Sequence, residues 1–143
     1  MKILIFCAAF CASAFALAQN SSVLNKTQNA PIQLFQQAVQ LADSGKKEQA
    51  LEVLNRLMAD FPELPEPYNN AAVLYAQNKQ WDKALETLKM AISVHPQFAK
   101  AHQNLGFVYL ELARQAFQNA HEIAPGSVLK ELEVLKQLQS FQK

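Results

Sequence analysis

Three histidines are the side chains of this sequence best suited to proton transfer or metal binding. No two of His95, His102 and His121 are four residues apart, the helical spacing that would place two imidazole rings on one metal ion. His95 stands directly before Pro96, at a helix end where a histidine can interact with the helix dipole. We assign all three to packing or surface roles and predict neither a metal site nor a cofactor.

The other reactive side chains form no catalytic pattern either. The sequence has no glycine-rich phosphate loop and no serine in a nucleophile elbow, and its carboxylates are scattered as solvent-facing helix positions would be. The formal net charge of +1 gives no reason to expect nucleic acid as a partner. We therefore predict a protein that is not an enzyme, with a weak catalytic or metal-binding role as the least favoured alternative.

Residues 1–18 are organised like a secretory signal peptide. Lys2 supplies a positive start, an uncharged apolar run follows, and Ala16 and Ala18 fit the small-x-small pattern of a cleavage site. The run is short for a membrane-spanning helix. We expect cleavage between Ala18 and Gln19, a periplasmic or secreted protein with no stable membrane span, and a polar, flexible tail over 19–30. A retained membrane anchor is the alternative.

Cleavage at that point would also decide the cysteine chemistry. The two cysteines, Cys7 and Cys11, both lie in the signal segment, so the remaining chain would have no thiol and no disulfide. Its stability would then come from helix packing alone.

The rest of the chain repeats with a period of 34 residues. Pro31 and Pro65 are one period apart, and so are Pro62 and Pro96. In the middle unit, a first apolar stripe with the i, i+3, i+4, i+7 spacing of a helix face is followed by an interruption and then by a second stripe. The first stripe contains Tyr68, Ala71, Ala72 and Tyr75, and the second contains Trp81, Ala84, Leu85, Leu88, Ala91 and Ile92.

These units resemble tetratricopeptide repeats. The signature of that family is aromatic-x-x-Leu-Gly-x-x-Tyr, then Ala-x-x-x-Phe, then Pro, and the middle unit matches it with Tyr68, Ala71, Ala72, Tyr75, Ala84, Leu88 and Pro96. The first unit matches more weakly, through Ala38, Ala50, Leu54 and Pro62. The resemblance covers 31–125, as units 31–64, 65–98 and 99–125, and implies an all-α fold, a short solenoid of helical hairpins.

The third unit lacks the residues that should form its turn. Tyr75 and Ala84 are nine residues apart in the middle unit, whereas their counterparts Tyr109 and Ala113 are four apart. Four residues make just over one helical turn, so these two side chains share a face. We predict one continuous helix from about Ala99 to Ala124, with a tight kink near Leu112–Arg114 that preserves a cramped hairpin as the alternative.

The C-terminal segment 126–143 has the apolar spacing of one more helix. Leu129, Leu132, Leu135 and Leu138 recur at helical intervals. Repeat arrays need a terminal helix to cover their last exposed face, so we predict a capping helix. The alternative is a helix that pairs between chains, which would make the protein a self-assembling homo-oligomer.

The resemblance also implies where a partner would bind, because the first helix of each pair lines a concave groove in this family. The set that clamps a C-terminal carboxylate in some relatives is matched here only by Asn70 and Lys100, so that clamp is not predicted. The predicted groove is instead apolar and rimmed by amides, and suits a peptide segment of another protein. Its predicted partner-binding residues are Ile32, Phe35, Val39, Asn69, Asn70, Val73, Lys100, Gln103, Asn104 and Phe107.

The sequence therefore predicts a non-enzymatic scaffold or adaptor. The combination of a signal segment with a short repeat array is similar to small exported proteins of the bacterial cell envelope. That similarity implies a partner protein in the envelope.

Overall fold

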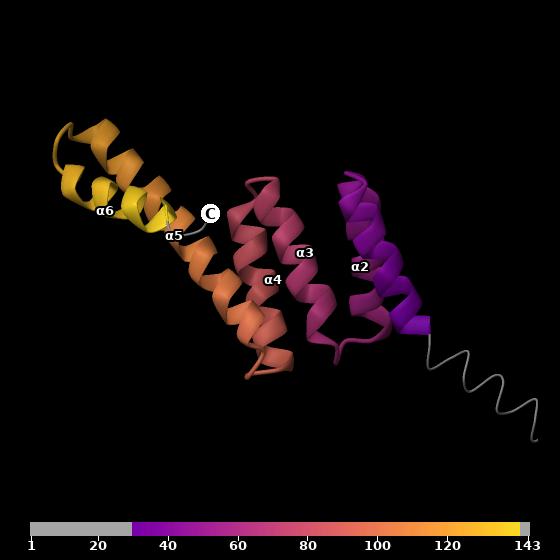
Figure 1. Cartoon of the computed structure of the whole chain (residues 1–143). Coiled ribbons are helices and arrows are strands. Elements are labelled where there is room, and N and C mark those ends of the chain that lie inside the picture. The colour runs from indigo at the N-terminus through magenta and orange to yellow at the C-terminus, as the bar shows by residue number, and fades with distance from the viewer. Residues whose placement is uncertain (1–29, 141–143) are drawn as a thin grey trace, which may run out of the picture.

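The computed structural model describes residues 30–140, which form six helices and no strand. The helices span 30–43, α2 (Lys47–Asp60), α3 (Pro65–Gln77), α4 (Trp81–Val94), α5 (Ala99–Ile123) and α6 (Leu129–Ser140). They stand side by side in chain order (Figure 1), as expected for a helical solenoid. The predicted signal and residues 19–29 of the predicted tail lie outside the described residues, and Ala30 is already helical. None of the described helices is long and apolar enough to cross a membrane.

The first two hairpins turn at equivalent positions of the repeat. Gly45 and Lys79 are 34 residues apart, and both have a left-handed backbone, with φ of +76° and +58°. The turns share their hydrogen bonds, because the N–H of Lys46 donates to the Leu41 carbonyl and the N–H of Gln80 donates to the Tyr75 carbonyl, each at 2.9 Å. This is the Schellman pattern that ends a helix through one left-handed residue.

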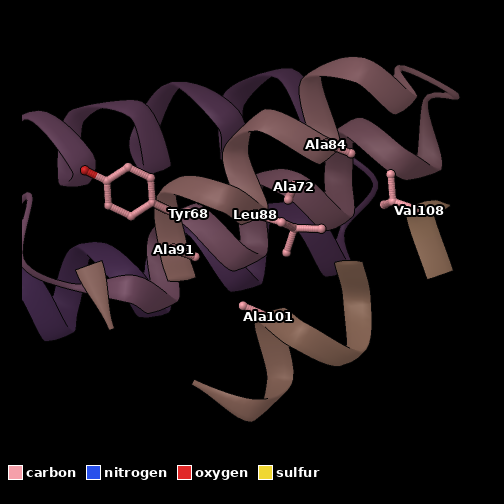
Figure 2. Packing of buried hydrophobic residues seen from close by; sticks show 7 residues of the cluster. All are labelled: Tyr68, Ala72, Ala84, Leu88, Ala91, Ala101 and Val108. Carbon is pink, nitrogen blue, oxygen red and sulfur yellow. The ribbon is translucent and has the colours of Figure 1, made fainter. Parts of the chain in front are cut away.

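Small residues let the helices of each pair approach closely. One core cluster joins the helix at 30–43 to α2 and α3 through Ala38, Ala50, Leu54, Leu57, Ala71 and Leu74. The second cluster joins α3, α4 and α5, and Figure 2 shows its seven side chains converging from these helices. Four of those seven residues are alanines, so the space between the helices is filled by Leu88, Tyr68 and Val108.

The third unit is a single rod. α5 is unbroken from Ala99 to Ile123, about 38 Å at 1.5 Å per residue, which confirms the predicted loss of the turn. α5 packs on α4 with its first half and extends beyond it, and α6 folds back along the projecting half (Figure 1). α6 therefore caps the end of α5, with Leu135 as its buried residue.

The left-handed position at Lys79 should limit the stability of the middle hairpin. A non-glycine residue is strained at positive φ, so Lys79→Gly should raise the free energy of unfolding by about 0.5–1 kcal/mol. The reverse change at the equivalent position, Gly45→Ala, should lower it by about 1 kcal/mol. Thermal melting followed by circular dichroism checks both, and a lower melting temperature for Lys79→Gly would contradict this account of the turn.

Candidate functional site

Two adjoining hollows lie on the face formed by the first helix of each unit. The first has a volume of about 270 Å³ and the second about 300 Å³. Both are lined by Val73, Gln77 and Asn104, so together they form one groove, which crosses from the helix at 30–43 over α3 to α5. The remaining lining residues of the first hollow are Ala38, Val39, Ala42, Asp43, Leu54, Asn69, Asn70, Leu74 and Lys100, and those of the second are Ala72, Ala76, Trp81, Leu88, Phe107, Val108 and Glu111.

Seven of the ten residues predicted from the sequence line this groove. They are Val39, Asn69, Asn70, Val73, Lys100, Asn104 and Phe107. The other three lie outside the two hollows. Phe35 packs against the core of the first unit, whereas Ile32 and Gln103 are exposed.

Three amide side chains form a hydrogen-bonded row across the floor of the groove. Asn104 on α5 donates from Nδ2 to Oδ1 of Asn69 on α3 at 2.8 Å, and Asn69 donates from Nδ2 to Oδ1 of Asn70 at 3.3 Å. Asn69 is 1% exposed, and both its Oδ1 and its Nδ2 form hydrogen bonds within this row. Asn69 therefore fixes the two amides beside it, and its contact with a partner stays a prediction.

The orientation of the row gives the groove one donor and one acceptor. Asn104 keeps its Oδ1 as an acceptor, and Asn70 keeps the N–H groups of its Nδ2 as donors. Because Asn69 holds both side chains, their polar atoms are ordered before any partner arrives.

Apolar side chains and unlike charges surround the amide row. Val39, Val73 and Phe107 supply apolar surface along the length of the groove. Lys100 and Asp43 line the first hollow, whereas Glu111 lines the second and binds Arg114 at 2.9 Å. The groove therefore has no excess of positive charge among the residues that line it.

Sequence reasoning missed Trp81, which lines the second hollow. We had assigned Trp81 only to the core stripe of α4. It is the first residue of α4, directly after the turn that follows Gln77, so its ring reaches the end of the groove. Its indole Nε1 is buried and is the one such side-chain atom in the described part of the chain without a hydrogen-bond partner. The position after a turn was the signal that could have revealed it.

The three histidines make contacts near the ends of helices. The Nε2 of His102 lies 2.8 Å from the Pro96 carbonyl, and the Nδ1 of His121 accepts the Gly126 N–H at 3.1 Å. His95 packs edge-on against Phe98, with ring centroids 6.3 Å apart. Within residues 30–140, no three or more His, Cys, Asp or Glu side chains are grouped so that they could hold a metal ion.

The fold defines the class of protein as a repeat of antiparallel helix pairs, and a family comparison makes this specific. Residues 41–106 match the tetratricopeptide repeat family model, so this segment is a tetratricopeptide repeat region. No curated protein sequence matches the chain. The resemblance drawn from the 34-residue period is thus confirmed.

Solved tetratricopeptide repeat (TPR) domains share the architecture. The first TPR of Spaghetti (RPAP3), bound to the HSP90 peptide SRMEEVD, aligns with a TM-score of 0.56 at 20% identity, over 77% of this chain and 93% of that one. The second TPR domain of human RPAP3, in complex with an HSP70 peptide, aligns with a TM-score of 0.54 at 23% identity, over 73% and 93%. The Sgt2 TPR domain from Aspergillus fumigatus gives 0.56 at 21% identity, over 77% and 79%. At these identities the likeness shows the fold.

The amide row should be needed for stability as well as for the shape of the groove. Asn69→Ala removes two partly buried hydrogen bonds and leaves the Nδ2 of Asn104 without its acceptor, so we expect a loss of about 1–2 kcal/mol in the free energy of unfolding. Gln103→Ala, at an exposed position of α5, is the control and should change it by less than about 0.5 kcal/mol. Urea unfolding measures both, and equal values for the two variants would contradict the structural role of Asn69.

Proposed function

We propose that this protein is a non-enzymatic interaction module that binds a short peptide segment of a partner protein in the groove. The observation that carries the proposal is the continuity of the two hollows, which share Val73 and Asn104 and so offer one site long enough for several peptide residues. A groove with an apolar floor and a few fixed polar groups is the usual form of such a site.

The geometry favours an extended peptide. The Oδ1 of Asn104 can accept a peptide N–H, and the Nδ2 of Asn70 can donate to a peptide carbonyl, so the two amides can hold a main chain of any sequence. Val73 lies between the two hollows, where apolar side chains of the peptide would lose their contact with water. Hydrogen bonds to the peptide main chain would supply affinity, and the apolar contacts would make the groove select peptides with apolar side chains.

The charges of the groove favour a different peptide from those named for the structural neighbours. Two of those neighbours are bound to peptides that end in Glu-Glu-Val-Asp. Here Lys100 and Asp43 both line the first hollow, and Glu111 lines the second, so a strongly acidic tail would meet carboxylates as well as one ammonium group. We infer an apolar, nearly uncharged segment as the ligand.

The signal-like segment 1–18 is the basis for proposing where in or outside the cell the protein acts. Residues 1–18 fit a signal peptide in charge, length and cleavage pattern, so we place the protein in the periplasm or outside the cell. The partner would then be an envelope or secreted protein. This step rests on the sequence of 1–18 alone.

Peptide binding should depend on Val73. A phage-displayed library of random seven-residue peptides, selected on the purified protein, should yield apolar sequences. The fluorescence of Trp81, the only tryptophan of the chain, should report their binding. Val73→Asp should weaken binding at least tenfold, about 1.4 kcal/mol, because it places a charge between the two hollows.

Met90→Asp is the matched control for this experiment. Met90 is an exposed apolar residue of α4 that does not line either hollow, so its variant should bind as the parent does. The peptide SRMEEVD should bind more weakly than the selected peptides. Equal binding by the Val73→Asp variant, with its helicity intact, would remove the groove from consideration.

Export should remove the first eighteen residues. Intact-mass measurement on the protein from its producing cell should show a chain that begins at Gln19, and Ala18→Asp should leave the precursor uncleaved. Recovery of the complete chain from the membrane fraction would favour the retained anchor. That result would leave the peptide groove untouched, because the groove lies wholly within 30–140.

A further inference from the structure

The two hollows of the groove are one structural feature that the repeat produces twice. A shift of 34 positions converts nine lining residues of the first hollow into nine of the ten that line the second. The equivalent pairs are Ala38 and Ala72, Val39 and Val73, Ala42 and Ala76, Asp43 and Gln77, Leu54 and Leu88, Asn70 and Asn104, Val73 and Phe107, Leu74 and Val108, and Gln77 and Glu111. Each repeat period therefore contributes one hollow of the same build.

The repeat also sets the distance between the two hollows. The first lies mainly between the helix at 30–43 and α3, and the second lies mainly between α3 and α5. These neighbouring helices pack directly on each other. Because helices in contact have axes about 8–10 Å apart, moving on by one first helix places the two hollows about 8–10 Å apart.

One backbone conformation of a peptide matches this separation. In polyproline II, three residues complete one turn with a rise of about 3.1 Å each, so residues i and i+3 face the same side about 9.3 Å apart. A β-strand instead places residues i and i+2 on one side, about 6.8 Å apart, and the next residue on that side at about 13.6 Å. Neither strand spacing fits two hollows that are one helix apart.

The amides of the groove follow the same period. Asn70 and Asn104 are equivalent residues of the repeat, and each keeps a polar atom free beside its hollow. A polyproline II chain forms no internal hydrogen bonds, so its carbonyl and N–H groups are open to such partners. The hollows can therefore take side chains while the amides bind the main chain between them.

The second hollow differs from the first by its aromatic walls. Phe107 stands where the first hollow has Val73, and Trp81 closes one end. Lys47, the counterpart of Trp81, does not line the first hollow, and its Nζ lies 3.5 Å from the Oδ1 of Asn78. Aromatic side chains pair favourably with one another, so the second hollow suits an aromatic side chain and the first suits an aliphatic one.

Size and charge agree with an aromatic occupant. A cavity of about 150 Å³ can hold a benzene ring, and the second hollow has about 300 Å³. Glu111 is the charged residue among those that line it, and its carboxylate is paired with Arg114 at 2.9 Å. An uncharged ring would therefore enter without separating an exposed charge from water.

We propose that the groove binds a polyproline II segment of a partner protein, with an aliphatic side chain and an aromatic side chain at positions i and i+3 in either order. The aliphatic side chain occupies the first hollow, and the aromatic side chain occupies the second. This inference rests on the proposed function, because it takes peptide binding in the groove as given. It adds the conformation of the peptide and the spacing of its two anchoring side chains.

Synthetic peptides test the spacing. Leu and Phe are set two, three or four positions apart in a frame of prolines, in both orders, and their affinity for the protein purified from its producing cell is measured by isothermal titration calorimetry. In the preferred order, the spacing of three should bind at least about tenfold more tightly than either other spacing, because only that peptide fills both hollows. Equal or tighter binding at a spacing of two or four would overturn the proposal.

Two equivalent alanines test which side chain enters which hollow. Ala42→Leu narrows the first hollow and Ala76→Leu narrows the second, so each variant is the matched control of the other. Ala76→Leu should abolish the gain in affinity that the peptide obtains from Phe over Ala, and should keep the gain from Leu over Ala. Ala42→Leu should do the reverse. Loss of both gains in either variant, with helicity intact by circular dichroism, would contradict the assignment.

Phe107→Ala provides a second variant that should not disturb folding, because this side chain is 38% exposed. It should remove the preference for Phe over Leu at the aromatic position of the peptide, and an unchanged preference would overturn the aromatic assignment. The effect of Val73→Asp separates this inference from the proposed function. Peptides that depend on Val73 but show no preferred spacing would overturn the polyproline II segment and leave groove binding in place. Peptides that bind without any dependence on Val73 would remove both.

Discussion

At Gly45 and Lys79 the backbone enters the left-handed region, and the hydrogen bonds of the Schellman motif reverse the chain there. Everything else in the array follows from whether this reversal occurs. Where it does, the helix that follows lies antiparallel to the one before, and the two apolar stripes meet. Where the residues for it are missing, between Tyr109 and Ala113, the backbone hydrogen bonds of the helix simply continue.

The reversal of the chain matters because the apolar stripes of α3 and α4 contain small residues that allow very close contact between the helices. Ala72, Ala84 and Ala91 are almost fully buried, and their small side chains bring the helix backbones together around Leu88. This tight core rigidly spaces the first helices of the units. The amide row from Asn104 through Asn69 to Asn70 bridges α5 and α3 at that spacing, so the shape of the groove is a consequence of the packing behind it.

The helix pairs and the long helix could be predicted from the sequence, because the repeat period shows both where the pattern holds and where residues are missing. A 34-residue offset linking prolines and alanines defines the helix pairs, and an offset of 29 from Pro96 to Pro125 reveals the missing turn. The groove was less predictable. Lining by Val39, Val73 and Phe107 follows from the family geometry, whereas the burial of Asn69 and the packing of Phe35 depend on contacts between distant residues that periodicity does not encode. Trp81 illustrates the same limit, because a core position at a helix start also forms the end wall of the groove.

The long helix gives α5 two separate tasks on two sides. Asn104 and Phe107 form one wall of the groove, and Ala101 and Val108 anchor the helix on α4. The side with Gly106 and Tyr109 is left over from a repeat that the chain no longer closes, and it retains the residue types of that repeat. Ala113 and Ala120, the small residues in the second half of the helix, are half-buried where α6 folds back along α5, because small side chains let two helices approach closely.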